Sequence, residues 1–130
     1  MIFKYSKKVI EHFLHPKHWG KIKNPDSIGD TLNLRCGDIM KIYIKVSKKK
    51  KKEYIEKISF ETLGCGAAIA TSDMICGLAK GKTLKEAKKI GFKDIADELS
   101  SLPVQKIHCA RLAEIALKMA IKEYERKKKK

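Results

Sequence analysis

Long apolar runs are absent from this chain of 130 residues. No segment approaches the roughly 18 apolar residues that a membrane-spanning helix needs. The opening segment, Met1 to Lys8, lacks the apolar stretch and small-residue cleavage site of a secretory signal. We therefore expect no helical membrane anchor and no membrane partner. We also expect a cytoplasmic protein whose thiols stay reduced.

Acidic residues are scarce: Lys and Arg total 30 against 15 Asp and Glu, a net charge of +15. The densest basic blocks are Lys48 to Lys52, between two strand-like segments, and Lys127 to Lys130 at the C-terminal end. Aromatic residues are also few, and none alternates with the lysines as in nucleic-acid-binding strands. We therefore expect no specific nucleic-acid partner, and only weak, nonspecific adhesion to nucleic acids at low salt. A basic nucleic-acid-binding domain is an alternative interpretation of the same charge.

Paired cysteines of the C-x-x-C type are missing, which excludes a zinc ribbon. Three of the four cysteines instead have distinctive neighbours: Cys36 precedes Gly37, Cys65 stands between two glycines, and Cys109 follows His108. Because they are far apart in the sequence, folding would have to bring them together. They predict a metal or sulfur site that is open on one side.

The neighbours of these cysteines favour reactive thiolates. Arg35 supplies positive charge beside Cys36, and both Cys65 and Cys109 precede or begin predicted helices, where unpaired N–H groups lower a thiol pKa. Cys76 differs, because it sits inside an apolar helix and is predicted to be a packed core thiol.

Three thiolates and one harder ligand, Asp38 or His108, match a tetrahedral zinc site or one edge of an iron–sulfur cluster. A carboxylate among thiolates is a poor partner for cluster iron, so it would keep a cluster exchangeable. Two other interpretations of these residues are ordinary buried thiols and a Cys–His nucleophile. The second is disfavoured because adjacent residues of a helix, such as His108 and Cys109, point in different directions. His12, His15 and His18 are predicted to be surface residues.

Hydrophobic periodicity predicts an α+β fold with a small three-stranded antiparallel sheet, helices packed on one face and a long C-terminal helix. A single domain is expected over residues 1–126, followed by a lysine tail over 127–130. The predicted elements are a helix around 5–14, strands at 29–35, 39–46 and 54–63, a helix over 67–80, a helix capped by Thr83 and Glu86, a short helix at 94–99 and a helix over 105–126.

Two packing details follow from the same pattern. In the third strand, Ile58 and Phe60 are predicted to face the core, with Ile55 and Leu63 off that face. Trp19, in a loop rich in turn residues, is predicted to pack over the edge of the core.

Together these motifs resemble the IscU/NifU N-terminal family of iron–sulfur cluster assembly scaffolds, over nearly the whole chain from Tyr5 to Tyr124. The segments that carry the resemblance are Tyr5-Ser6-Lys7-Lys8-Val9-Ile10-Glu11-His12-Phe13, Cys36-Gly37-Asp38-Ile39-Met40, Gly64-Cys65-Gly66-Ala67-Ala68-Ile69-Ala70-Thr71-Ser72, and Lys106-Ile107-His108-Cys109 with Leu112-Ala113.

The resemblance implies a scaffold, not an enzyme, that builds a transient [2Fe–2S] cluster from iron and the sulfur of a cysteine desulfurase and transfers it to apo-proteins. It makes Cys36, Cys65 and Cys109 cluster ligands, Asp38 the residue that keeps the cluster labile, and His108 a candidate fourth ligand. Cys109 would also accept sulfur, and Zn²⁺ or Fe²⁺ can occupy the same site.

One departure from the family's pattern concerns a possible partner. The segment Leu102 to Lys106 is similar to the family's chaperone-recognition loop but lacks its second proline, so an Hsp70-type chaperone partner is left open. The alternative function is a zinc-binding persulfide or sulfur-relay module that regulates a cysteine desulfurase.

Overall fold

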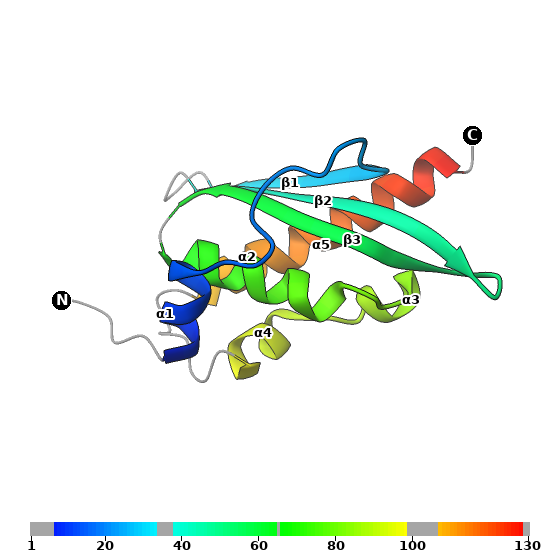
Figure 1. The fold of residues 1–130 in the computed structure, drawn as a ribbon. Coiled ribbons are helices and arrows are strands. Elements are labelled where there is room, and N and C mark those ends of the chain that lie inside the picture. The colour runs from blue at the N-terminus through cyan, green and yellow to red at the C-terminus, as the bar shows by residue number, and fades with distance from the viewer. Residues whose placement is uncertain (1–6, 34–37, 65, 99–106, 129–130) are drawn as a thin grey trace.

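The computed structural model describes residues 7–33, 38–64, 66–98 and 107–128. Its elements, in chain order, are α1 (Lys7–Leu14), β1 (Ser27–Asn33), β2 (Asp38–Lys49), β3 (Lys52–Leu63), α2 (Gly66–Ala79), α3 (Leu84–Ala87), α4 (Phe92–Glu98) and α5 (Ile107–Lys128) (Figure 1).

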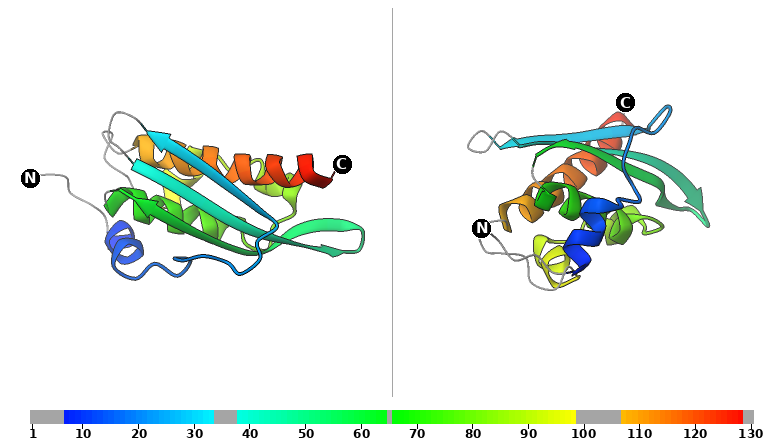
Figure 2. Two further views of the ribbon diagram at one scale, coloured as in Figure 1. Left: turned by 90° about the horizontal axis from the view of Figure 1, so that it is seen from above. Right: turned by 60° about the vertical axis from the view of Figure 1, so that its left-hand side comes forward.

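The three strands form one antiparallel sheet in the order β1-β2-β3. Helices α2 and α5 pack against one face of it, and α1 and α4 pack against α2 (Figures 1 and 2). The predicted α+β architecture, with its long C-terminal helix, is thereby confirmed. Among the described helices, none is both long enough and apolar enough to cross a membrane.

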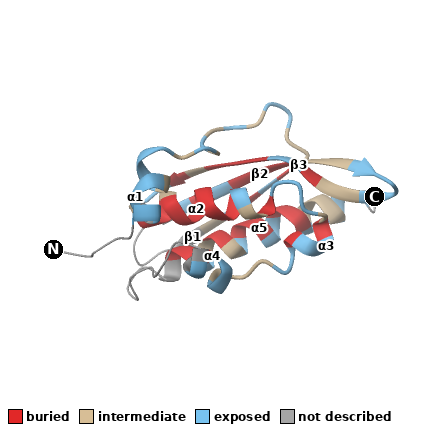
Figure 3. Cartoon of the chain, turned by 60° about the horizontal axis from the view of Figure 1, so that its bottom comes forward, coloured by how far each residue is buried: buried red, intermediate tan, exposed pale blue. Residues whose placement is uncertain are grey.

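The core lies between the sheet and the two central helices. Met40, Ile42 and Ile44 alternate along β2 and are fully buried, as is Phe60 of β3. Helix α2 is buried around most of its circumference because the sheet and three helices surround it (Figure 3). Its apolar sequence, rich in alanine, allows this close packing on several sides at once.

Strand β3 departs from the predicted alternation at Ile55. Lys45 pairs with Lys57 and Val46 pairs with Ile55, so Glu56 is an extra residue in β3. This β-bulge reverses the side to which the following residues point. Ile55 is fully buried together with Ile58, and the prediction that it lies off the core face is wrong, whereas Leu63 is 72% exposed as predicted.

The connection after α2 follows the sequence signals closely. Gly81 adopts a positive φ of 83° beyond the end of α2, the conformation that helix-terminating glycines favour. Thr83 and Glu86 form the predicted capping box at the start of α3. Helix α5 continues to Lys128, so it includes the first two residues of the predicted lysine tail.

Candidate functional site

One end of the molecule gathers the ends of five elements. β1 ends there and β2 begins, with Asn33 paired to Asp38, and β3 ends with Leu63 paired to Ile39. The first residues of α2 and α5 lie at the same end (Figures 1 and 2). We call this the cysteine end, because each of the three candidate cysteines adjoins or belongs to one of these termini.

The predicted site residues are described to different extents. Cys36 and Cys65 lie outside the described residues, one between β1 and β2 and the other between β3 and α2. Asp38 is the first residue of β2 and His108 the second of α5, and only their backbones are described. Among the described side chains, no three potential metal ligands of the His, Cys, Asp or Glu type come together.

Cys109 is the candidate ligand whose side chain is described. It lies in the first turn of α5 and has no exposed surface, packed in the core cluster with Ala110 and Ala113. Another molecule can reach this thiol only when Cys109 becomes exposed.

The residue after Cys65 is closely covered by α1. An added Cβ on Gly66 would stand 3.3 Å from the ring of Phe13. The glycine therefore lets α1 pack against the first turn of α2. Phe13 is itself 42% exposed, so α1 adds an apolar surface to the cysteine end.

A buried carboxylate fastens α1 and the following connection to α2. Asp73, only 1% exposed, lies with Oδ2 2.5 Å from Nδ1 of His12, and its Oδ1 accepts a hydrogen bond of 2.9 Å from the backbone N–H of His18. Partial burial lowers the pKa of His18, whereas the negative charge of Asp73 acts in the opposite direction and raises it. His15 is exposed as predicted, but His12 and His18 are half-buried, so for them the surface prediction is wrong.

Residues 18–20 cover the free edge of β3. The N–H of Gly20 donates to the carbonyl of Phe60 at 2.8 Å, and the N–H of Phe60 donates to the carbonyl of His18 at 2.9 Å. The Trp19 ring meets Phe60 edge-to-face with centroids 5.3 Å apart. The predicted packing of Trp19 over the edge of the core is confirmed.

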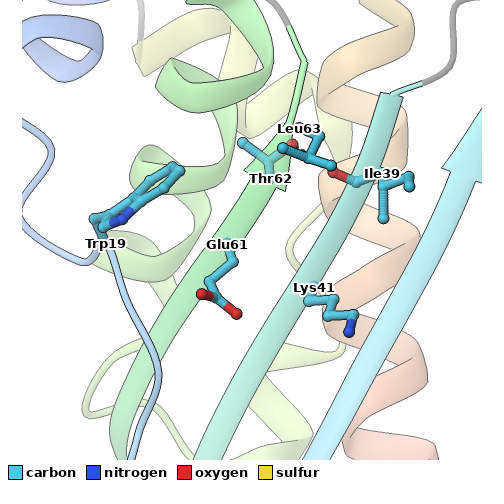
Figure 4. A pocket seen from close by; sticks show the side chains of 6 residues that line it. All are labelled: Trp19, Ile39, Lys41, Glu61, Thr62 and Leu63. Atoms are coloured by element: carbon cyan, nitrogen blue, oxygen red, sulfur yellow. Dashed lines mark hydrogen bonds between the residues drawn. The ribbon is translucent and has the colours of Figure 1, made fainter.

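A shallow hollow of about 310 Å³ lies beside this edge, towards the cysteine end (Figure 4). It is lined by Trp19, Ile39, Lys41, Glu61, Thr62 and Leu63. Three of these six residues, Trp19, Ile39 and Leu63, are exposed apolar residues. One feature of the sequence indicates this surface. Leu63 is apolar but lies off the core-facing side of its predicted strand, immediately before Gly64-Cys65-Gly66.

Cys76 takes no part in the cysteine end. It is fully buried in α2, and burial, with a further contribution from the charge of Asp73, raises the pKa of its thiol well above the ordinary value. A protonated, inaccessible thiol is a poor metal ligand and a poor nucleophile. The prediction that Cys76 is a core residue is confirmed.

Comparison with known proteins gives a consistent result. The family model described as the NifU-like N-terminal domain matches residues 4–130. The iron–sulfur cluster assembly scaffold protein IscU 1 of Archaeoglobus fulgidus is 51% identical over 123 residues, covering 95% of this chain and 78% of that protein. The scaffold protein IscU of Escherichia coli is 45% identical over 127 residues, covering 95% and 96%.

Solved structures share the fold. A candidate scaffold protein of the SUF system from Fervidobacterium islandicum superposes with a TM-score of 0.72 at 21% identity, covering 90% of this chain and 96% of that one. The N-terminal part of a NifU-like protein from Brucella abortus has a TM-score of 0.62 at 17% identity, covering 94% of both chains. By its sequence motifs, its family match and the identity of its relatives, this chain belongs to the NifU-like N-terminal domain family.

Proposed function

We propose that this protein is an iron–sulfur cluster assembly scaffold that builds a [2Fe–2S] cluster as cargo on Cys36, Cys65 and Cys109. The observation that carries the proposal is family membership, with relatives named as such scaffolds at 43% to 51% identity over about 95% of the chain. The gathering of the flanking strand and helix ends at the cysteine end supports it. The role is to hold and release a product, not to catalyse its turnover.

The ligand types suit transient binding. Three thiolates supply soft donors for iron, and Asp38 or His108 supplies a harder fourth donor. Asp38 is the residue at which β2 begins, directly opposite Asn33, so its backbone is held by the sheet. A cluster with one weak ligand on a fixed framework can be bound and then released to a recipient.

Sulfur enters, in this proposal, at Cys109. Its thiolate attacks the outer sulfur of a persulfide on a cysteine desulfurase, the S–S bond breaks, and the desulfurase leaves as its own thiolate. Cys109 then carries the persulfide, whose reduction to sulfide uses electrons from an external reductant. Because Cys109 is fully buried here, docking of the desulfurase has to accompany its exposure.

The remaining partners follow from this chemistry. Apo-proteins with free thiolates take the cluster, and Zn²⁺ or Fe²⁺ can bind the same thiolates in its absence. Reduced thiols require a reducing compartment such as the cytoplasm. The segment considered for an Hsp70-type chaperone lies within 99–106, outside the described residues, so this partner stays open.

Anaerobic reconstitution tests the proposal. With ferrous iron, cysteine and a desulfurase, the chain should develop the visible absorption of a [2Fe–2S] cluster, and an apo-ferredoxin should then remove it. Cys36→Ala, Cys65→Ala and Cys109→Ala should each abolish the chromophore. Cys76→Ala is the matched control and should retain it. A colourless wild-type product, or equal loss in the Cys76 variant, would contradict the proposal.

A further inference from the structure

The opposite end of the molecule carries a basic surface that cluster assembly does not use. Three adjoining hollows run from the β2–β3 hairpin past the start of α3 to the end of α5. Their volumes are about 400, 300 and 510 Å³, and neighbouring hollows share lining residues. We call this continuous surface the lysine trough, lined by Lys49, Lys50, Lys52, Lys85, Lys88 and Lys128.

The walls of the trough are held in place by backbone pairing. Ile55 donates its N–H to the carbonyl of Lys82 at 2.9 Å, and the N–H of Gly81 donates to the carbonyl of Ile55 at 2.8 Å. Tyr54 and Thr83 form a bridge beside them. Below its tip, the hairpin is thereby hydrogen-bonded to the connection between α2 and α3.

The hairpin sequence works against the local stability of the hairpin. Lys50 and Lys51 adopt positive φ values of 51° and 68°, a conformation that glycine and asparagine accept far more readily. Lys49 stands directly opposite Lys52, which places like charges together across the strands. Residues that disfavour their own backbone conformation or pairing are typical of sites where function, not stability, selects the sequence.

Part of the trough charge is already compensated. Lys88 pairs with Glu125 and Lys128 with Glu53, each at 2.7 Å. Within the described part of the chain, Lys49, Lys50, Lys52 and Lys85 have no such ion pair, and all four are exposed. The charge of Lys52 also interacts with that of Glu86. The uncompensated charge of the trough is therefore that of Lys49, Lys50 and Lys85, and Glu53 and Glu125 stand at its far end.

From these observations we propose that the lysine trough docks an extended segment of a partner protein rich in Asp and Glu. A peptide can place carboxylates against the free lysines and neutral residues against Glu53 and Glu125. A nucleic-acid strand carries a phosphate at every nucleotide and cannot avoid these two carboxylates. Among the described residues that line the hollows, Tyr54 is the one aromatic residue, too little for the base stacking that single strands use.

A partner docked in the trough would lie far from the cysteine end. The hairpin and the end of α5 lie at the opposite end of the molecule from the cysteine end (Figures 1 and 2). A partner bound there leaves the cysteine end uncovered and raises the local concentration of a second module of that partner near the site. Docking at the trough can be measured on the protein without a cluster.

Fluorescence anisotropy of a fluorescein-labelled peptide that carries a block of Glu residues next to a block of Ser residues tests the proposal. Loss of three exposed ion pairs predicts roughly tenfold weaker binding for Lys49→Gln/Lys50→Gln/Lys52→Gln. The matched control, Lys17→Gln/Lys21→Gln/Lys93→Gln, removes the same charge from exposed positions outside the trough. It should weaken binding by less than about twofold.

A labelled oligothymidine of equal charge, measured in the same buffer, provides the second arm and should bind more weakly than the peptide. Equal weakening in both lysine variants, tighter binding of the oligothymidine, or no peptide binding at low salt would each overturn the proposal. Circular dichroism spectra of the variants should match the wild type, because all the substituted side chains are exposed.

Discussion

Gly29 is the residue at which the sheet and the last helix come closest. An added Cβ would lie 2.1 Å from the carbonyl oxygen of Ala116 and 2.4 Å from the backbone nitrogen of Ala120. Beside it, the hydroxyl of Ser27 donates to the carbonyl of Ala120 at 2.6 Å. Because these contacts are with backbone atoms, a side chain at Gly29 cannot be accommodated without moving β1 away from α5.

Gly29→Ala should therefore lower the free energy of unfolding by about 3 kcal/mol, the range of overpacked core sites. Urea denaturation followed by circular dichroism measures this change. Gly77→Ala is the matched control, since Gly77 is an exposed position in α2 with no close obstruction. The control should gain about 0.5–1 kcal/mol from helix propensity. Equal effects of the two substitutions would rule out the close approach as the cause.

In the proposed function, Asp38 is the residue that keeps the cluster labile. Removal of its carboxylate in Asp38→Ala should slow cluster loss roughly tenfold, an effect of the size that changes around metal ligands produce. Loss of visible absorption in the presence of a chelator gives the rate. Asp30→Ala, an exposed β1 position away from the cysteine end, serves as the control and should leave the rate unchanged. An unchanged or faster rate for Asp38→Ala would contradict this role.

At the scale of elements, the α1–α2 contact depends on a carboxylate and two histidines. His18 faces Asp73 and Lys80 of α2, His12 of α1 and its neighbour Lys17. Burial lowers the pKa of His18 below its ordinary value of 6.5. In the unfolded chain His18 binds its proton more readily, so acidification favours unfolding at this position.

The contribution of His18 is complete above pH 6.5 and is lost as the pH falls below it, so the free energy of unfolding should decrease from pH 7 to pH 5. His18→Gln should show a smaller decrease over this interval. Urea denaturation at several pH values measures both slopes. His15→Gln, an exposed position in the same connection, should keep the wild-type slope.

The β2–β3 hairpin gives a second prediction for a single element. Lys50→Asn/Lys51→Gly would replace the two lysines of the turn with residues that accept positive φ. The free energy of unfolding should rise by about 1 kcal/mol. Lys50→Gln/Lys51→Gln removes the same charge but keeps the unfavourable backbone, so it should gain less. Equal gains in the two variants would assign the effect to charge alone.

For the molecule as a whole, the sequence predicted local features better than contacts between distant residues. The three strands, the apolar helix α2 and the Thr83 capping box follow from periodicity and short motifs. The bulge at Glu56 and the contact of His12 with Asp73 depend on how separate elements meet, which no local pattern encodes. The convergence of Cys36, Cys65 and Cys109 stays a prediction, because two of the three lie outside the described residues.

The net charge of +15 should also govern the stability of the whole molecule. The compact state brings like charges together, and salt screens their repulsion. Salt also weakens exposed ion pairs such as Lys88–Glu125 and Lys128–Glu53, but such pairs contribute only about 0–1 kcal/mol each. Since basic residues outnumber acidic ones 30 to 15, relief of repulsion should prevail.

We therefore expect the free energy of unfolding to rise by about 1 kcal/mol as sodium chloride increases from about 0.01 to 0.3 M, because the Debye length shortens over this interval. Urea denaturation at each salt concentration measures the change, and sucrose of equal osmolality controls for solvent effects unrelated to charge. Lys49→Gln/Lys50→Gln/Lys52→Gln lowers the net charge and removes the opposed pair Lys49–Lys52, so its salt dependence should be weaker than that of the wild type. A free energy of unfolding that falls with salt would show that ion pairs outweigh repulsion in this fold.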